Sequence, residues 1–252
     1  MRANIRILIF LFLACISFPA IAQDAVIKEA EVAYTKEDYN TAIELYEGIL
    51  ENNGESAAIY YNLGNSYYKS GKIAQAILNY ERALLLSPAD ADIRFNLQLA
   101  KQMTVDKIEP LGEFFLVKWY HSIQNIASAD GWGRTGIVTF LVFLVCLAVF
   151  FFSKQRLFKQ VGFYAGVLFL FVTIMSNVFG SAQKSELTNR SDAIVFTPTV
   201  TVKSSPDNSG TDLFVIHEGT KVSVKSTLGE WSEISLEDGN VGWMPSKDIV
   251  KI

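Results

Sequence analysis

The spacing of hydrophobic positions changes several times along this chain, and each spacing predicts a different kind of element. An apolar run occupies the N-terminus, helical spacing of three and four follows to about residue 106, two uncharged runs fill the middle, and alternation by two begins near residue 193. These patterns predict amphipathic helices, membrane-length helices and half-buried strands. The sequence therefore predicts several domains around a membrane segment rather than one compact globule.

The N-terminal run predicts export from the cytoplasm. Two arginines precede the stretch ILIFLFLACISF, and a proline and the triplet Ala20-Ile21-Ala22 follow it. This layout is typical of a secretory signal that is cleaved before Gln23. A lipoprotein signal would use Cys15, but Phe12 stands where a small or aliphatic residue is expected. An uncleaved anchor is the other alternative, and it leaves the following domain on the same side of the membrane.

Between residues 24 and 106 the apolar positions repeat with a period of 34. Shifting the sequence by one period brings together Tyr39, Ala42, Ile43, Tyr46, Ile49 and Leu50 with Ile73, Ala76, Ile77, Tyr80, Ala83 and Leu84. This period and pattern resemble the tetratricopeptide repeat (TPR), a pair of helices. Asp38 and Ser56 suit helix N-caps, and Pro88 suits the end of the second unit. Residues 91–105 are expected to form a closing helix or half of a third repeat.

The TPR resemblance implies a concave surface made by the first helix of each pair. It assigns to this protein-binding surface Ala58, Tyr61, Asn65, Tyr68, Lys69 and Phe95. Tyrosine offers a rigid apolar area with a polar tip, and Asn65 can hydrogen-bond an extended backbone. The alternative is that these side chains are ordinary solvated surface. The groove has fewer Lys and Arg residues than a carboxylate clamp needs, so recognition of a carboxyl terminus is not expected.

Residues 107–133 carry a stripe of apolar residues at near-helical spacing. Its members are Leu111, Phe115, Trp119, Ile123 and Ile126, with polar residues between them. The stripe predicts either a helix at the membrane surface, with its Trp and Tyr at headgroup level, or a helix packed on the repeats. The sequence leaves both open.

Two uncharged runs predict a membrane hairpin. The first spans residues 135–152 and the second residues 161–183. Eighteen helical residues extend about 27 Å, close to the thickness of a hydrocarbon core. The intervening segment holds Lys154, Arg156 and Lys159 without an acid, which predicts a cytoplasmic loop. Together with the signal, this loop places the domains before and after the hairpin outside the cytoplasm.

The last segment alternates with the period of strands, as at Val200 and Val202 or Val222 and Val224. Pro and Gly turn dipeptides separate these runs. The motifs VKSSP, HEGTKV, WSEI and DGNVGW, in this order, resemble the bacterial SH3 domain. The resemblance implies a small barrel in which Trp243 packs the core, leaves Trp231 as a surface contact, and suggests peptidoglycan as a ligand.

Composition excludes several function classes. The net charge is −4 and no basic stripe lies outside the membrane flanks, so nucleic acid is not an expected partner. Both cysteines, Cys15 and Cys146, lie in apolar runs, and neither histidine has ligand residues beside it. No glycine-rich phosphate loop is present. We therefore expect no catalytic residues, no metal site and no cofactor.

The domain boundaries predicted from these patterns are 1–22 signal peptide, 23–106 TPR module, 107–133 amphipathic juxtamembrane segment, 134–153 first transmembrane helix, 154–160 cytoplasmic basic loop, 161–183 second transmembrane helix, 184–192 linker and 193–252 bacterial SH3-like domain. The predicted fold class is a multidomain membrane protein with an all-α repeat, a transmembrane α-hairpin and an all-β barrel.

This order of modules resembles the BatE-type proteins of the Bacteroides aerotolerance operon over the whole chain. The resemblance implies a non-enzymatic adaptor in the inner membrane. Its partners would be membrane proteins of the same operon with von Willebrand A domains, together with a MoxR-type ATPase, in oxygen or stress tolerance. The alternative function is peptidoglycan binding through the barrel. A membrane enzyme is a third class. Residues 135–152 and 161–183 contain no charged residue and no histidine, which argues against it.

Overall fold

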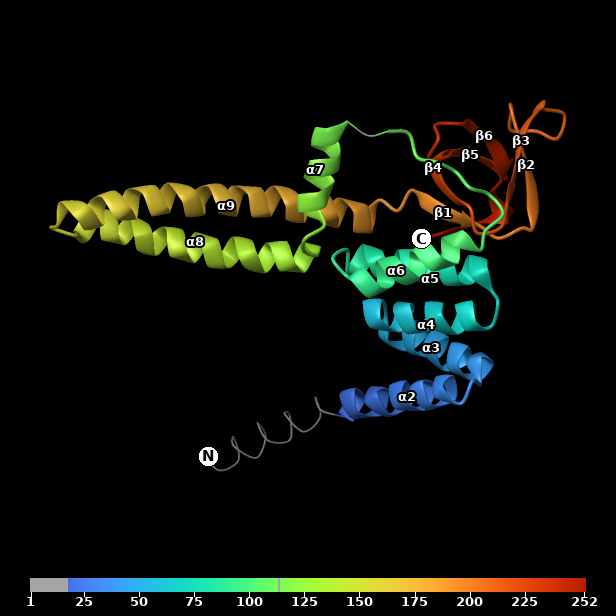
Figure 1. Cartoon of the computed structure of the whole chain (residues 1–252), viewed down its shortest axis with the longest axis horizontal. Helices are drawn as coiled ribbons and strands as arrows, with labels where there is room; N and C mark the ends of the chain where they lie inside the picture. Colours follow the sequence, from blue (N-terminus) through green and yellow to red (C-terminus); the bar gives the residue numbers. More distant parts are fainter. Residues whose placement is uncertain (1–17, 113) are drawn as a thin grey trace, which may run out of the picture.

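The computed structural model describes residues 18–112 and 114–252. Most of the predicted signal peptide, including Cys15, lies outside these residues. A stack of helices, a long helical hairpin and a small β-barrel follow one another along the chain, with a short helix, α7, beside the hairpin (Figure 1). The fold class predicted from the sequence is confirmed in all three parts.

The N-terminal stack consists of α2 (Phe18–Thr35), α3 (Tyr39–Asn53), α4 (Ala57–Lys69), α5 (Ile73–Leu86) and α6 (Ala91–Gln102). Small buried residues such as Ala42 and Ala76 let neighbouring helices approach closely. A Cβ at Gly64 would lie 2.7 Å from the ring of Tyr80, which explains the glycine at this repeat position. Asp38 caps α3 by accepting from the Thr41 amide, whereas Ser56 makes no side-chain cap.

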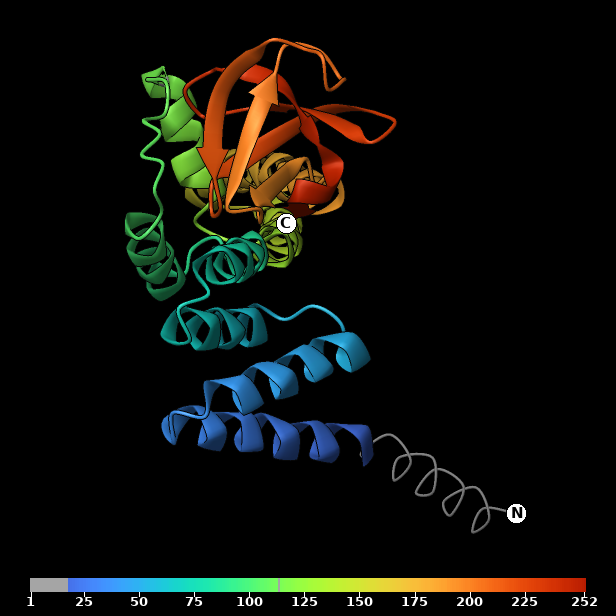
Figure 2. The same ribbon diagram turned by 90° about the vertical axis from the view of Figure 1, so that its right-hand side faces the viewer.

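The barrel covers the end of this stack, next to α5. Ile194 and Ile252 of the barrel are buried in the same apolar cluster as Ile77 of α5. Figure 2 shows the barrel at one end of the stack and α2 at the other. Because a repeat cannot bury both of its faces alone, repeat stacks need terminal caps. The barrel supplies this cap, so residues of both modules share the core of the stack, while the barrel also has a core of its own.

The hairpin consists of α8 (Ala129–Phe152) and α9 (Arg156–Thr188), both long and apolar enough to cross a membrane. Small residues bring the helices together: a Cβ at Gly162 would lie 2.9 Å from the Cys146 carbonyl oxygen. The hydroxyls of Thr139 and Thr173 lie 2.8 Å apart. Most other apolar side chains of the hairpin point outward without a protein partner, as expected for helices in lipid.

The helix ends differ from the predicted span boundaries. The basic segment 154–160 was expected to be a loop, but α9 begins at Arg156 and only residues 153–155 lie between the helices. The predicted linker 184–192 is helical as far as Thr188. The predicted boundaries were set where charged residues begin. The helices extend further because their backbone hydrogen bonds do not depend on whether the side chains are charged.

Between the stack and the hairpin lies the helix α7 (Phe115–Gln124), which packs against α9. The Tyr120 and Phe179 rings lie 5.5 Å apart. The buried Gln124 donates from Nε2 to Glu186 Oε1 over 2.8 Å. The part of the amphipathic stripe in α7 therefore lies beside the hairpin, whereas Leu111 lies against the barrel.

The barrel is a seven-stranded antiparallel sheet with the order β3-β2-β6-β5-β4-β1-β7. Its strands are β1 (Asp192–Val195), β2 (Thr199–Lys203), β3 (Asp212–His217), β4 (Lys221–Leu228), β5 (Trp231–Ser235), β6 (Val241–Pro245) and β7 (Ile249–Lys251). Val202, Val222 and Ile234 form its core with Met244. Alternation along β2 and β5 places every second residue inward, as the sequence predicts.

Candidate functional site

A polar network occupies the face of the stack that is formed by α4 and α6. Asn65 Oδ1 accepts a hydrogen bond from the Tyr80 hydroxyl over 2.7 Å and another from Asn96 Nδ2 over 2.9 Å. Asn96 Nδ2 also donates to the Tyr61 hydroxyl oxygen over 3.0 Å. The network thus joins three helices and fixes the orientation of the Tyr61 and Asn65 side chains.

This arrangement leaves hydrogen-bond donors available on the groove. Both acceptor positions of Asn65 Oδ1 are used, so its amide nitrogen is the group left for a ligand. The Tyr61 hydroxyl accepts from Asn96 and can still donate its proton. The exposed Lys69 adds a positive charge at the end of α4. Such a surface suits a partner that presents carbonyl or carboxylate oxygens.

The other residues predicted from the sequence lie around the network. Ala58 and Phe95 are exposed, and the Phe95 side chain is 61% exposed beside Asn96. Tyr68 is half-buried and packs on the repeat core. Trp231 lies on β5 of the barrel, half-buried and opposite Leu228 and Pro245. The repeat residues therefore share one module, and Trp231 belongs to a separate surface.

A hollow beside this network is lined partly by residues that were missing from the predicted set. It has a volume of about 290 Å³, lies between α2 and α4 and is lined by Glu31, Tyr34, Thr35, Tyr46, Asn62 and Asn65. Burial, the Glu31 carboxylate and Tyr34 raise the pKa of Tyr46 to about 12, so its hydroxyl stays neutral near pH 7. Glu31 and Tyr34 stand one 34-residue period before Asn65 and Tyr68. Extending the repeat alignment to α2 would have identified both.

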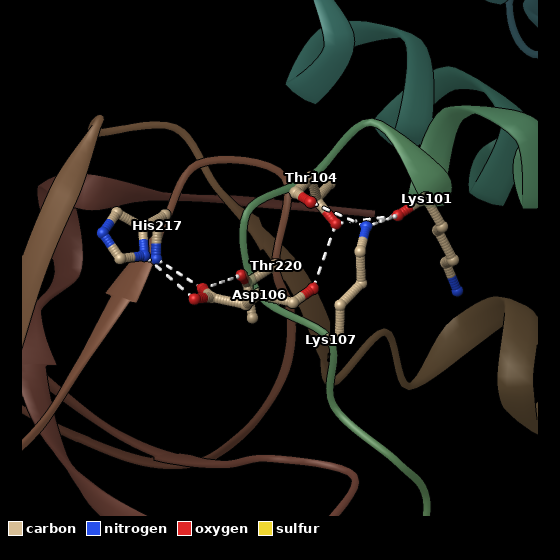
Figure 3. Close-up of polar contacts among 6 residues, drawn as sticks. All are labelled: Lys101, Thr104, Asp106, Lys107, His217 and Thr220. Carbon is tan, nitrogen blue, oxygen red and sulfur yellow. Dashed lines mark hydrogen bonds and ion pairs between the residues drawn. The ribbon is translucent and has the colours of Figure 1, made fainter.

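A second polar cluster joins the stack to the barrel at Asp106, just after α6 (Figure 3). Asp106 Oδ2 accepts from the His217 backbone amide over 2.6 Å and from the Thr220 hydroxyl over 2.7 Å. His217 Nδ1 lies 2.9 Å from Asp106 Oδ1. Partial burial would raise the pKa of Asp106, but the hydrogen bonds from His217 and Thr220 hold it below its usual value.

The same connection is fixed at its other side. Lys107 Nζ donates to the carbonyl oxygens of Lys101 over 3.2 Å and Thr104 over 2.7 Å, at the end of α6 (Figure 3). It also donates to the Gln102 carbonyl oxygen over 2.9 Å. A cation at this position interacts favourably with the negative end of the helix dipole. The chain that leaves the repeats is therefore held against the barrel.

A buried carboxylate forms a third contact between the modules. Glu81 of α5 lies 2.9 Å from Lys221 Nζ of the barrel and 2.8 Å from Lys101 Nζ of α6. Lys221 Nζ also lies 3.1 Å from Asp192 Oδ2. Burial alone would raise the pKa of Glu81, but the two lysines hold the carboxylate ionised, with its pKa below the usual value.

The end of α9 is tied to the stack as well. The Arg190 guanidinium contacts the Glu55 carboxylate through two hydrogen bonds of 2.6 and 2.5 Å. Arg82 donates to the Lys251 carbonyl oxygen over 2.8 Å. A cavity of about 320 Å³ lies where α5, the end of α9 and β1 meet. None of these contacts was predicted, because their partners are more than a hundred residues apart without a shared period.

Two family models match separate parts of the chain. The model described as TPR repeat matches residues 64–103, and the model described as Bacterial SH3 domain matches residues 198–250. The chain is 34% identical over 92 residues to the peroxisomal targeting signal receptor of Saccharomyces cerevisiae. This match covers 36% of the chain and 15% of the receptor.

Among solved structures, the chain is similar to the Sgt2 TPR domain from Aspergillus fumigatus. The match covers 67% of this chain and 82% of that domain, with 15% identity and a TM-score of 0.31. The TPR and bacterial SH3 modules suggest an interaction scaffold. Within the described residues, no group of three or more His, Cys, Asp or Glu side chains could hold a metal ion.

Proposed function

We propose that this protein is a non-enzymatic, membrane-anchored adaptor whose repeat groove binds a partner protein. The observation that carries the proposal is the network of Tyr61, Asn65 and Asn96, which holds hydrogen-bond donors toward the groove beside the exposed Phe95. An ordered set of donors beside an apolar side chain suits an extended segment of a partner. The hairpin keeps this groove close to the membrane.

The partner class and the orientation belong to the same proposal. The resemblance to BatE-type proteins suggests membrane proteins with von Willebrand A domains and a complex with a MoxR-type ATPase in aerotolerance. Lys154, Arg156 and Lys159 support a cytoplasmic turn between α8 and α9, with the repeats and barrel on the periplasmic side of the inner membrane. Protease treatment of spheroplasts tests the orientation: digestion of both modules is expected, and their protection would overturn it.

In-cell photocrosslinking tests the groove. A photoreactive amino acid replaces Phe95 of α6 or Ala58 of α4, which are both exposed. The control position is Glu44, which is exposed on α3, the second helix of its pair. Crosslinks to one membrane protein from positions 95 and 58 but not from 44 would support the groove. Equal crosslinking from all three positions, or none from 95 and 58, would count against it.

Substitutions in the groove need care because Asn65 and Tyr61 also join helices. Phe95→Ser changes an exposed side chain and leaves the network in place, so it separates binding from folding. We expect Phe95→Ser to reduce recovery of the partner from detergent extracts about tenfold, the effect of losing roughly 1.4 kcal/mol at an interface. Glu44→Ser is the matched control and is expected to leave recovery unchanged.

A second candidate function is peptidoglycan binding by the barrel. The half-exposed Trp231 on β5 and the match of residues 198–250 to the bacterial SH3 model favour it. Because the barrel shares a core with the repeats, the full chain in detergent is the proper sample for pull-down on purified sacculi. Binding that is lost with Trp231→Ala but kept with Phe95→Ser would support this function. Absence of binding would leave the groove as the main contact.

A further inference from the structure

Helix α7 exposes large apolar side chains outside the hairpin. Phe115 is 68% exposed, Trp119 64% and Leu116 50%. Contiguous apolar surface of this kind marks an interaction site rather than ordinary surface.

The C-terminal end of α7 is held in a polar and aromatic layer at one end of the hairpin. The Trp132 indole of α8 donates from Nε1 to the Gln124 carbonyl oxygen over 2.8 Å. Gln183 of α9 donates from Nε2 to Asn125 Oδ1 over 2.8 Å. The Trp132 and Phe179 rings lie 5.0 Å apart. Figure 1 shows α7 running across the hairpin at this end rather than along it.

This layer lies at the edge of the uncharged part of the hairpin. Gln183 ends the uncharged run of α9, and Lys184 and Glu186 follow it. In α8, Arg134 immediately precedes the uncharged run. Trp and Tyr side chains concentrate at the membrane–water interface because one end of each ring is apolar and the other polar. The layer therefore marks the height at which lipid tails give way to headgroups.

The helical period divides α7 into unlike flanks. Tyr120 and Gln124 face α9, as their contacts with Phe179 and Glu186 require. Because successive residues are about 100° apart around a helix, Leu116, Trp119 and Ile123 then share one flank. Lys118 and His121 fall on the other. An amphipathic helix that lies across a bilayer surface needs this division.

We propose that α7 lies in the plane of the membrane, with the flank of Leu116, Trp119 and Ile123 inserted among the lipids and Lys118 and His121 facing the headgroups and water. The occupant is lipid because α7 packs against α9 at the end of the hairpin where Ile137, Val138 and Val178 are exposed apolar side chains. Tyr120, on the side of α7 next to this flank, contacts Phe179 in the uncharged run, whereas Gln124 contacts Glu186 beyond it. The proposal depends on the hairpin crossing the membrane but not on the identity of any protein bound by the groove.

The connection before α7 gives this placement a consequence for the soluble modules. Leu111 donates its backbone amide to the Glu237 carbonyl oxygen over 3.0 Å, and Ile108 packs against the barrel core. The chain thus runs from the repeats along the barrel and directly into α7. A helix fixed in the membrane surface would hold the barrel and the repeats at a set height above the lipids.

Spin labelling of the full chain in phosphatidylcholine/phosphatidylglycerol vesicles tests the proposal. Cys15→Ala and Cys146→Ala remove the natural thiols, and single cysteines are then introduced by Leu116→Cys, Trp119→Cys, Lys118→Cys or His121→Cys. We expect labels at 116 and 119 to collide mainly with oxygen, which concentrates in lipid. Labels at 118 and 121 are expected to collide mainly with a water-soluble nickel chelate.

Each other outcome has a defined meaning. Equal access of the nickel chelate to all four positions would overturn the proposal. Low access of both reagents at 116 and 119 would also overturn it, because the flank would then be covered by protein, including a second copy of the chain. A label from Val145→Cys, at a 63% exposed position of α8, checks the hairpin separately. Lipid-like access at 145 with water-like access at 119 would reject the α7 placement alone.

A conservative substitution provides a measurement that does not depend on a bulky label. Brominated phosphatidylcholine quenches tryptophans within reach of the lipid tails. We expect Trp119→Phe to lower the quenched share of the protein's fluorescence, whereas Trp231→Phe on the barrel should raise it by removing unquenched emission. An unchanged quenched share in Trp119→Phe would contradict lipid contact at this position.

Discussion

Lys221 of the barrel places its ammonium group 2.9 Å from the buried carboxylate of Glu81, which lies 140 residues earlier in α5. Burial by itself would lower the pKa of Lys221, but the charges of Glu81 and Asp192 raise it, so the ion pair is intact at neutral pH. The charged groups at this contact stabilise each other only while the two modules are in place.

Removing one partner tests this contact. Lys221→Met leaves the buried Glu81 carboxylate with Lys101 alone. We expect the free energy of unfolding in detergent to fall by about 3 kcal/mol, because an incompletely paired buried charge is costly. Lys225→Met, at an exposed position of the same strand, is the control and should change the midpoint little. Equal midpoints for the two variants would show that the ion pair contributes nothing.

The shared core predicts a stability effect that crosses modules. Ile194 is fully buried against the repeat helices, so Ile194→Ala opens a cavity there and should cost about 3 kcal/mol. Hydrogen exchange should rise in α5, 108 or more residues earlier in the chain. Val202→Ala, in the core of the barrel itself, should accelerate exchange in the strands first. The same exchange pattern in both variants would contradict a division between the core of the stack, which holds Ile194, and the core of the barrel, which holds Val202.

Asp106 predicts a dependence of stability on pH. Its folded-state pKa lies below the ordinary value, so its contribution is present above about pH 4 and is lost as the pH falls through the folded pKa. Asp106→Asn should therefore lower the free energy of unfolding by about 2 kcal/mol at pH 7. The difference from the natural protein should shrink in acid.

Thermal unfolding of both proteins in detergent between pH 7 and pH 3 measures this difference. Glu218→Gln, at an exposed position beside His217, serves as the control and should follow the natural protein across the range. A constant gap between Asp106→Asn and the natural protein down to pH 3 would contradict the linkage.

Close packing of the hairpin predicts an effect of a single methyl group. A Cβ at Gly162 would meet backbone atoms of Cys146 and Phe150 at 2.9 and 3.0 Å, and backbone cannot move aside easily. Gly162→Ala should separate α8 from α9 and cost about 2 kcal/mol, as overpacking does. Gly133→Ala, where a Cβ has open space, should be neutral or slightly stabilising. Thermal unfolding in lipid nanodiscs compares the two.

The sequence was sufficient for features set by local periods. The 34-residue repeat placed Tyr46 and Tyr80 in the stack core, and alternation by two placed Val200 and Val202 inside the barrel. Both follow from side-chain geometry along a helix or a strand. Asp38 was a correct N-cap for the same reason, since its cap bond is to a residue three positions away.

Contacts between the modules could not be predicted in this way. Glu81 looks like a surface residue of α5, yet it is buried because Lys221 arrives from the barrel. Arg190 stands in a predicted linker but binds Glu55. Such pairs leave no periodic signal, because each depends on how whole modules meet. Tyr61 and Asn65 lie one turn apart on α4, as their spacing predicts, while their hydrogen bonds to Tyr80 and Asn96 required coordinates.

The position of Ile194 also bears on how the chain is made. This residue completes the apolar core of the repeats, but it is synthesised after both hairpin helices. During translation the apolar face of α5 therefore stays open until α8 and α9 have been made and β1 follows them. Completion of the repeat core is thus a late step in biogenesis: a chain that ends before β1 leaves its repeats unfinished, with an exposed apolar face that quality-control proteases can recognise.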